Sequence, residues 1–460
     1  MNTYYVTTLG CKVNQYESRQ IAQLLSNYGL KPVKFVQSPD IAVIHTCCVT
    51  HTASSKSRQL IRKIKRQNPD CTVIVTGCLT SVDTGEADNI GDGIIMLDRS
   101  VNLPDYLEKL LKNKKNQADS SNPVSKTAND DKIKDKDDKI TDKNDDFHLD
   151  DPLGLGSVTT FGSHSRAFLK IQDGCDGFCS YCIIPHIRKK LWSNPPEMVE
   201  KEARAMVAAG HKEIVLTGIY LSAYMQETVK RKRWDTSRSL ELVSLIERLV
   251  RIDGLMRLRL SSLEPGDITE PMIECFVKYP NLVPHLHLSL QSGSDRILRR
   301  MNRQYRTDEF LETVERLNNA LDRPAITTDL IVGFPGETEF DFDQSMEISR
   351  QAGFAKIHVF GFSKRRGTPA AKMQDQIETH VIKERVRRLS ELDKELQQKF
   401  RRQFAGEEIN IIVENTKKQT GRCERYFEVN YHTKHHQLPP KKGDFLRLRL
   451  KNNCIDAEIL

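Results

Sequence analysis

Strand-like and helix-like segments alternate along most of this 460-residue chain, and this alternation restricts its fold more than any other feature. Three strand-like segments near the start, separated by amphipathic helical patterns, are residues 3–9, 41–46 and 72–77. Parallel strands need a long crossover between them, usually a helix, so this order favours a parallel sheet. The sequence therefore predicts an N-terminal parallel α/β domain over residues 1–112.

Each of these three strands is followed by a cysteine, namely Cys11, Cys47 and Cys78. The carboxyl ends of parallel strands meet at one edge of the sheet, which is where ligands bind in such folds. We therefore expect the three thiols to converge in space. The chain has eleven cysteines, which we interpret as thiols of a reducing cytoplasm rather than as disulfides. No apolar run is long enough to span a bilayer, so we expect no membrane partner and a cytoplasmic location.

Residues 113–156 are rich in Asp and Lys and nearly free of apolar side chains. Such a segment buries too little apolar surface to offset the entropy cost of ordering. We predict a disordered linker there. The chain carries a net charge of +8 although this linker is acidic, so the folded parts are more basic than the total indicates. A basic surface favours a polyanionic partner such as RNA, although solubility alone also explains it.

Six further strand-like segments, again separated by helical patterns, are residues 167–173, 213–219, 258–263, 285–290, 325–334 and 356–362. This pattern predicts a partial (β/α)6 barrel over residues 157–395. Polar residues stand near the carboxyl ends of its strands, where barrels of this type build their active sites: Asp173, Thr217, Ser262, Gln291 and Asp329. Any one of them, taken alone, is as readily explained by capping a helix or a turn.

The last part, residues 396–460, contains short alternating segments that are typical of a small antiparallel β-barrel. Its basic and aromatic side chains suit RNA phosphates and bases, and they are Lys417, Lys418, Arg422, Lys434, Lys441, Lys442, Arg447, Arg449, Tyr426, Phe427 and Tyr431. The competing interpretation is an ordinary solvated basic face.

The segment "CDGFCSYC" places Cys175, Cys179 and Cys182 directly after the first barrel strand. Structural zinc needs four tetrahedral ligands, and His186 is the one nearby candidate for a fourth. A 4Fe–4S cluster held by three thiolates keeps one iron open for a small molecule. The spacing, with Tyr181 before the last cysteine, favours the open cluster over zinc.

This motif at the mouth of a β/α barrel resembles the radical S-adenosylmethionine superfamily. The resemblance extends over nearly the whole chain, apart from the linker, to the methylthiotransferases, through segments such as "TLGCKVNQYESRQ", "HTCCVTHTASSKSRQ", "HLSLQSGSDRILRRMNRQY" and "TTDLIVGFPGET". It implies an N-terminal α/β domain, a radical barrel and a small C-terminal TRAM barrel. It also implies two 4Fe–4S clusters, one held by Cys175, Cys179 and Cys182 and one by Cys11, Cys47 and Cys78.

The resemblance further implies roles for individual residues. It assigns the binding of S-adenosylmethionine to Tyr181, Thr217, Gly218, Ser262, Gln291 and Val332. Arg303 and Asp329 are implied to lie near the substrate. No side chain is assigned as catalytic, because the cofactors carry the chemistry. The segment "IRKKLWSN" after the barrel motif departs from the family pattern.

Around Cys47 the sequence is most similar to the MtaB branch of the family, which adds a methylthio group at carbon 2 of N6-threonylcarbamoyladenosine in tRNA. The resemblance therefore implies a monomeric tRNA-modifying transferase. Its partners are expected to be the tRNA anticodon stem-loop, a sulfur donor and a flavodoxin-like or ferredoxin-like electron donor. Two alternatives are methylthiolation of isopentenyladenosine in tRNA or of a ribosomal-protein aspartate. A further alternative is a non-enzymatic RNA-binding protein with zinc sites.

Overall fold

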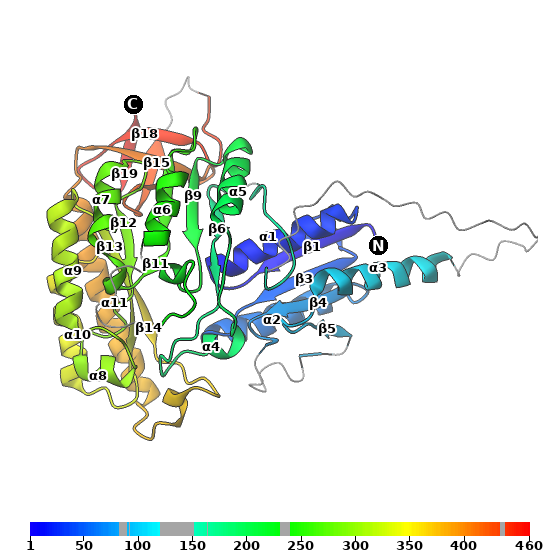
Figure 1. The fold of residues 1–460 in the computed structure, drawn as a ribbon, viewed down its shortest axis with the longest axis horizontal. Coiled ribbons are helices and arrows are strands. Elements are labelled where there is room, and N and C mark those ends of the chain that lie inside the picture. The colour runs from blue at the N-terminus through cyan, green and yellow to red at the C-terminus, as the bar shows by residue number, and fades with distance from the viewer. Residues whose placement is uncertain (82–89, 92, 120–150, 163, 231–239, 433–437) are drawn as a thin grey trace, which may run out of the picture. The chain divides into compact units, whose positions relative to one another are not determined.

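The computed structural model describes the chain apart from residues 82–89, 92, 120–150, 163, 231–239 and 433–437 (Figure 1). Its internal contacts divide the chain into two compact units. The N-terminal unit comprises Met1–Gly10, Glu17–Cys48 and Ala53–Ser157, and the C-terminal unit comprises Cys11–Tyr16, Val49–Thr52 and Val158–Leu460. No helix in the described residues is long and apolar enough to cross a membrane.

The sheet of the N-terminal unit has five strands in the order β2-β1-β3-β4-β5, and all of its pairings are parallel. The strands are β1 (Thr3–Thr8), β2 (Lys31–Pro32), β3 (Ile41–Thr46), β4 (Thr72–Gly77) and β5 (Ile94–Met96). The helices that alternate with them are α1 (Lys12–Asn27), α2 (His51–Gln67) and α3 (Leu103–Asp119). The predicted parallel α/β fold is confirmed, and the two short edge strands are additional to the three that the sequence indicated.

The central strands of this sheet, β3 and β4, are buried and mostly apolar. Every residue of β3 is buried, and Ile41 and Val43 pack with Ile74 of β4 in one cluster. Both ends of the predicted linker are ordered. Helix α3 continues to Asp119, and Leu153 and Leu155 are buried in the same cluster. The middle of that linker, residues 120–150, lies outside the described residues.

The C-terminal unit contains the second run of parallel strands. They are β6 (Ala167–Lys170), β9 (Glu213–Thr217), β10 (Arg257–Leu260), β11 (Ser262–Leu263), β12 (His285–Leu288), β13 (Ala325–Val332) and β14 (Lys356–Gly361). The helices of this unit are α4 (Ile184–Ile187), α5 (Pro196–Ala208), α6 (Leu240–Leu249), α7 (Glu270–Lys278), α8 (Asp295–Arg300), α9 (Thr307–Ala320), α10 (Glu339–Ala352) and α11 (Thr379–Arg402).

These strands form two adjoining parallel sheets, in the orders β10-β9-β6 and β11-β12-β13-β14. The third predicted strand is interrupted at Ser261, so its first half belongs to one sheet and its second half to the other. Strands β6 and β14 are the two outer edges of the described arrangement. The barrel is therefore partial, as the sequence predicted.

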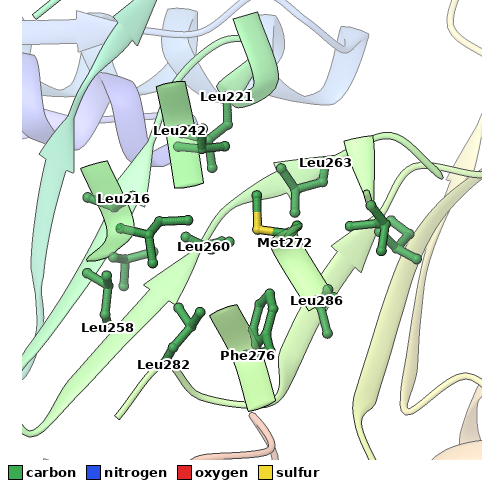
Figure 2. Close-up of a cluster of buried hydrophobic side chains, with 14 of the residues drawn as sticks. Leu216, Leu221, Leu242, Leu258, Leu260, Leu263, Met272, Phe276, Leu282 and Leu286 are labelled. Carbon is green, nitrogen blue, oxygen red and sulfur yellow. The ribbon is translucent and has the colours of Figure 1, made fainter. Parts of the chain in front are cut away.

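Leucine side chains fill the space between this sheet and its helices (Figure 2). Leu258 and Leu260 of β10 point toward the same cluster as Met272 and Phe276 of α7, and all four are buried. Fully burying one such side chain contributes about 1.5–3 kcal/mol to folding. This apolar packing fixes the barrel strands, and thereby the polar residues at their ends.

The last five strands close into a small barrel in the order β15-β16-β17-β19-β18. They are β15 (Glu408–Asn415), β16 (Thr420–Cys423), β17 (Glu428–His432), β18 (Phe445–Leu450) and β19 (Asp456–Ile459). The predicted small barrel is confirmed, and one of its pairings, between β17 and β19, is parallel. Strand β16 was not indicated by the sequence pattern.

Candidate active site

The loop that carries Cys175, Cys179 and Cys182 is closed at its base. It begins after β7 (Gln172–Asp173), and β7 pairs with β8 (Trp192–Ser193) at the far end of the loop. The backbone N–H of Cys175 donates to the carbonyl of Arg188 at 3.1 Å. The buried guanidinium of Arg188 also forms an ion pair with Asp173 at 2.6 Å. The three cysteines therefore lie on a loop whose two ends are held together by strand pairing and hydrogen bonds.

Gly174 makes this closure possible. Its φ is +81°, and a Cβ at this position would lie 1.9 Å from the carbonyl oxygen of Lys190. No other residue type fits without moving the backbone. Gly77 plays a similar part before Cys78, because its φ is +101° and a Cβ would lie 2.6 Å from the carbonyl oxygen of Thr46.

Two of the barrel thiols accept hydrogen bonds from nitrogen. Arg303 donates to the Sγ of Cys179 at 3.1 Å, and the backbone N–H of Gly177 donates to the Sγ of Cys175 at 3.3 Å. Arg303 is itself held by an ion pair with Glu264. Donors aimed at sulfur stabilise negative charge on it, which is what a thiolate ligand of a metal carries.

Burial acts in the opposite direction on these thiols. It raises the pKa of Cys175 to about 11 and that of Cys182 to about 12. A thiolate at either position is therefore unfavourable unless a cation neutralises it. Partly buried thiols that accept N–H···S hydrogen bonds fit iron coordination. Thiolates without a bound metal would be unstable in the same surroundings. His186, the alternative fourth ligand for zinc, is exposed on α4.

Five of the six residues predicted to bind S-adenosylmethionine lie at or near the carboxyl ends of the barrel strands, and the sixth, Tyr181, is on the cysteine loop. Thr217 ends β9, Ser262 begins β11 after the break, and Val332 ends β13. Gln291 follows β12 and has a φ of +67°, which is rare for a residue other than glycine and is typical of functional sites. The remaining two are Gly218, directly after Thr217, and Tyr181, which packs against a buried cluster that includes Met301 and Phe334. Their contact with the cofactor stays a prediction.

Asp329 and Arg303, the two residues predicted near the substrate, have different surroundings. Arg303 lies beside Cys179. Asp329 lies in the middle of β13, three residues before its end, with an oxygen 3.3 Å from the Nε2 of His287. The sequence reasoning did not single out His287 or its neighbour His358, because their proximity to Asp329 depends on the register of three strands.

The segment 187–194, where the sequence departs from the family pattern, contains both buried residues and exposed lysines. Arg188 and Asn194 are buried, whereas Lys189 and Lys190 are exposed. Besides Asp173, Arg188 bonds the side chain of Asn14 at 3.2 Å. This segment therefore supports the cysteine loop through Arg188 and presents two lysines to solvent.

In the N-terminal unit, Cys47 and Cys78 directly follow Thr46 and Gly77, which are paired residues of adjacent parallel strands. The backbone N–H of Cys78 donates to the carbonyl of Thr46 at 3.0 Å, so the two cysteines start from one edge of the sheet. Cys11 follows β1 in the sequence but falls within Cys11–Tyr16, which groups with the C-terminal unit. The convergence of all three thiols stays a prediction.

Several side chains of the small barrel that the sequence suggested for RNA contact are buried or engaged by other residues of the chain instead. Phe427 and Tyr431 are part of its core, and Tyr426 stacks on His285 of the larger barrel with ring centroids 4.3 Å apart. Arg422 is engaged by Glu414. The exposed basic residues that remain are Lys417, Lys418, Lys441, Lys442, Arg447 and Arg449, while Lys434 lies outside the described residues.

Comparison with known proteins places two family matches on the chain. Residues 169–348 match the model of the radical SAM superfamily, and residues 3–95 match a model described as uncharacterized protein family UPF0004. The first match covers the barrel with its cysteine loop. The second covers β1 to β5 and includes Cys11, Cys47 and Cys78.

Similar proteins cover nearly the whole length. The chain is 38% identical to the threonylcarbamoyladenosine tRNA methylthiotransferase MtaB of Bacillus subtilis, over 91% of this chain and 86% of the relative. It is 34% identical to the protein of the same name from Thermotoga maritima, over 98% and 95%. It is also 34% identical to a tRNA-2-methylthio-N(6)-dimethylallyladenosine synthase of Thermobifida fusca, over 89% and 78%.

Among solved structures, the radical S-adenosylmethionine methyltransferase TsrM from Kitasatospora setae is similar in fold, with a TM-score of 0.53 at 12% identity. The match covers 80% of this chain and 75% of that one. At this identity the similarity concerns the fold alone.

Proposed function

The chain belongs to the methylthiotransferase family of radical S-adenosylmethionine enzymes, and from this premise we propose that it adds a methylthio group at carbon 2 of N6-threonylcarbamoyladenosine in tRNA. The observation that carries the proposal is the match, at 34–38% identity over nearly the whole chain, to relatives named for this nucleoside. The similarity to the dimethylallyladenosine enzymes is lower or equal in identity and covers less of both chains than the Thermotoga match.

Within the barrel, we assign Cys175, Cys179 and Cys182 as ligands of the cluster that binds S-adenosylmethionine. When bound, this pair of cofactors supplies a 5′-deoxyadenosyl radical. Arg303 and the backbone of Gly177 stabilise the negative charge on the ligand sulfurs. Tyr181 of the cysteine loop and the strand-end residues, from Thr217 to Val332, orient the cofactor and exclude water from it. We place Asp329 near the substrate, inside the barrel.

We also assign Cys11, Cys47 and Cys78 as ligands of a second cluster that presents sulfur for transfer. Cys48 is not assigned, because its thiol donates to the carbonyl of Cys78 at 3.2 Å and belongs to the local packing. Cys47 is thus assigned as a cluster ligand, whereas the adjacent Cys48 stabilises the local packing.

The remaining partners follow from this reaction. Exposed lysines of the small barrel, such as Lys417 and Lys441, are suited to the phosphates of a tRNA anticodon stem-loop. A flavodoxin-like or ferredoxin-like protein donates electrons, and a separate protein or small molecule donates sulfur. We propose that the enzyme is a cytoplasmic monomer.

The test is nucleoside mass spectrometry on tRNA from a strain in which this gene is deleted. We expect the 2-methylthio form of threonylcarbamoyladenosine to disappear and the unmodified nucleoside to accumulate, with recovery on re-expression. Persistence of the methylthio form, in a strain without a second family member, would contradict the proposal. Loss of methylthiolated isopentenyladenosine or of a modified ribosomal-protein aspartate would instead identify one of the alternative substrates.

A further inference from the structure

Three neighbouring parallel strands in the C-terminal unit bring a carboxylate and two imidazoles together. Asp329 of β13 is the register partner of His358 of β14. His287 of β12 is the register partner of Thr327, which lies two residues before Asp329 on the same face of the sheet. All three side chains therefore extend from one face, although they are widely separated in the sequence.

The distances among these groups match those of metal ligands. One ligand atom from each of His287, Asp329 and His358 lies within 4.8 Å of the other two. The Nε2 of His287 is 3.3 Å from the Oδ2 of Asp329. Two ligands of a tetrahedral ion with bonds of 2.0–2.1 Å lie about 3.3 Å apart. His358 provides the third ligand atom, within 4.8 Å of the other two.

A second layer of contacts orients His287. Its Nδ1 lies 3.0 Å from the hydroxyl of Thr327, so Nε2 is the nitrogen that faces Asp329. Thr327 also contacts the Nε2 of His285 at 3.3 Å, and His285 stacks on Tyr426. Histidine ligands of metals are commonly fixed in this way through their other ring nitrogen.

The site also has access to solvent. His358 and Thr327 line a cavity of about 350 Å³ between β13, β14, α11 and the small barrel. The same cavity is lined by Lys356, Arg401 and Arg425. These cations are compatible with an ion that binds imidazole nitrogen and completes its coordination with an anionic or water ligand from the cavity.

We propose that His287, Asp329 and His358 form a binding site for one divalent transition-metal ion of the zinc class. Two imidazoles and one carboxylate, with at least one open position, are a donor set that such ions prefer. This site is separate from the six cysteines assigned to clusters. It also does not depend on which nucleoside the enzyme modifies.

Manganese(II) is a suitable probe, because thiolate sites bind it poorly and it has an electron paramagnetic resonance signal. The experiment uses full-length protein with its clusters reconstituted and kept oxidised. Mn²⁺ is titrated in, and the loss of the free-ion signal is measured, followed by displacement with Zn²⁺. We expect one Mn²⁺ per chain, released by one equivalent of Zn²⁺, and nitrogen couplings from two histidines in the pulsed spectrum.

Two variants and a matched control sharpen the test. H358A removes one ligand and D329N removes the charge with little change of shape, and each is expected to weaken Mn²⁺ binding at least tenfold while the iron content stays unchanged. H380A is the control, because His380 is an exposed histidine paired only with Glu378 in the described contacts, and it should bind Mn²⁺ as the wild type does.

The proposal is overturned if wild-type protein binds Mn²⁺ no more tightly than D329N. It is also overturned if the bound ion shows no histidine nitrogen coupling, which would leave His287 and Asp329 as a hydrogen-bonded pair without a metal. The pulsed measurement on wild-type protein keeps the test decisive even if a variant fails to fold.

Discussion

Replacing Glu213 by Gln is expected to destabilise the C-terminal unit by about 3 kcal/mol at neutral pH. Glu213 begins β9 with a fully buried side chain. It accepts from Arg259 at 2.9 Å and from Arg257 at 3.3 Å, and Arg166 lies 3.7 Å away. Arg257 and Arg259 in turn donate to backbone carbonyls of the small barrel, so this carboxylate connects the two barrels.

The size of this loss of stability follows from the lowered pKa of Glu213. Burial raises the pKa of Glu213, but Arg259, Arg166 and Arg257 outweigh burial and lower the pKa from 4.5 to about 2. At about 1.4 kcal/mol per pKa unit, this shift corresponds to roughly 3 kcal/mol. Mutations that remove one partner of a buried ion pair generally lower the free energy of unfolding by about 3–5 kcal/mol. This range agrees with the value obtained from the pKa shift.

The assay is anaerobic thermal unfolding of wild type and E213Q. A loss of about 3 kcal/mol corresponds to a melting temperature lower by roughly 4–6 °C in a unit of this size. Because the folded-state pKa is depressed, the stabilisation is fully present above about pH 4.5 and is lost as the pH falls toward 2. The difference between the two proteins should therefore shrink in acid.

The matched control is E200Q, because Glu200 lies nearer the surface and pairs with Arg204 and Arg248. Surface pairs contribute about 0–1 kcal/mol, so this variant should melt close to wild type. The reasoning is refuted if E213Q melts within about 2 °C of wild type at pH 7, or if its deficit is the same at pH 7 and at pH 3.

The remaining predictions concern the cysteine sites. G174A should lower the iron content from about eight to about four per chain, because its Cβ would overlap the backbone of Lys190 and displace the cysteine loop; full iron content would contradict this. R303M should lower the reduction potential of the barrel cluster, since loss of an N–H donor to sulfur disfavours the added electron, and an unchanged potential in a redox titration would exclude this role. C47S should lose about four irons whereas C48S keeps them, and equal iron in the two variants would show that the ligand is misassigned.

The sequence was sufficient to predict the parallel sheets and the cysteine loop because both depend on local patterns. Strand β3 begins with four consecutive apolar residues, 41–44, and the three barrel cysteines lie within eight residues. Strand β2 was not predicted because it contains only Lys31 and Pro32, which have no strand pattern of their own. Leu153 and Leu155, within the predicted linker, are ordered by tertiary packing that composition does not reveal.

The parts that the sequence did not reveal depend on which face of an element is covered. Tyr426 and Phe427 have the residue types of an RNA-binding surface, yet one stacks on the larger barrel and the other fills a core. His287 and His358 meet Asp329 only because three strands align in register. Arg303 reaches Cys179 across 124 positions of sequence, a distance over which local patterns carry no information.

The most direct test of the account is the mass of a tRNA anticodon stem-loop containing N6-threonylcarbamoyladenosine after incubation with the anaerobically reconstituted enzyme, S-adenosylmethionine, a sulfur source and a reductant. The account predicts the mass change in which a methylthio group replaces hydrogen, and no change with a C179A variant. An unchanged mass under conditions in which the enzyme produces 5′-deoxyadenosine, or modification of an isopentenyladenosine stem-loop instead, would contradict it.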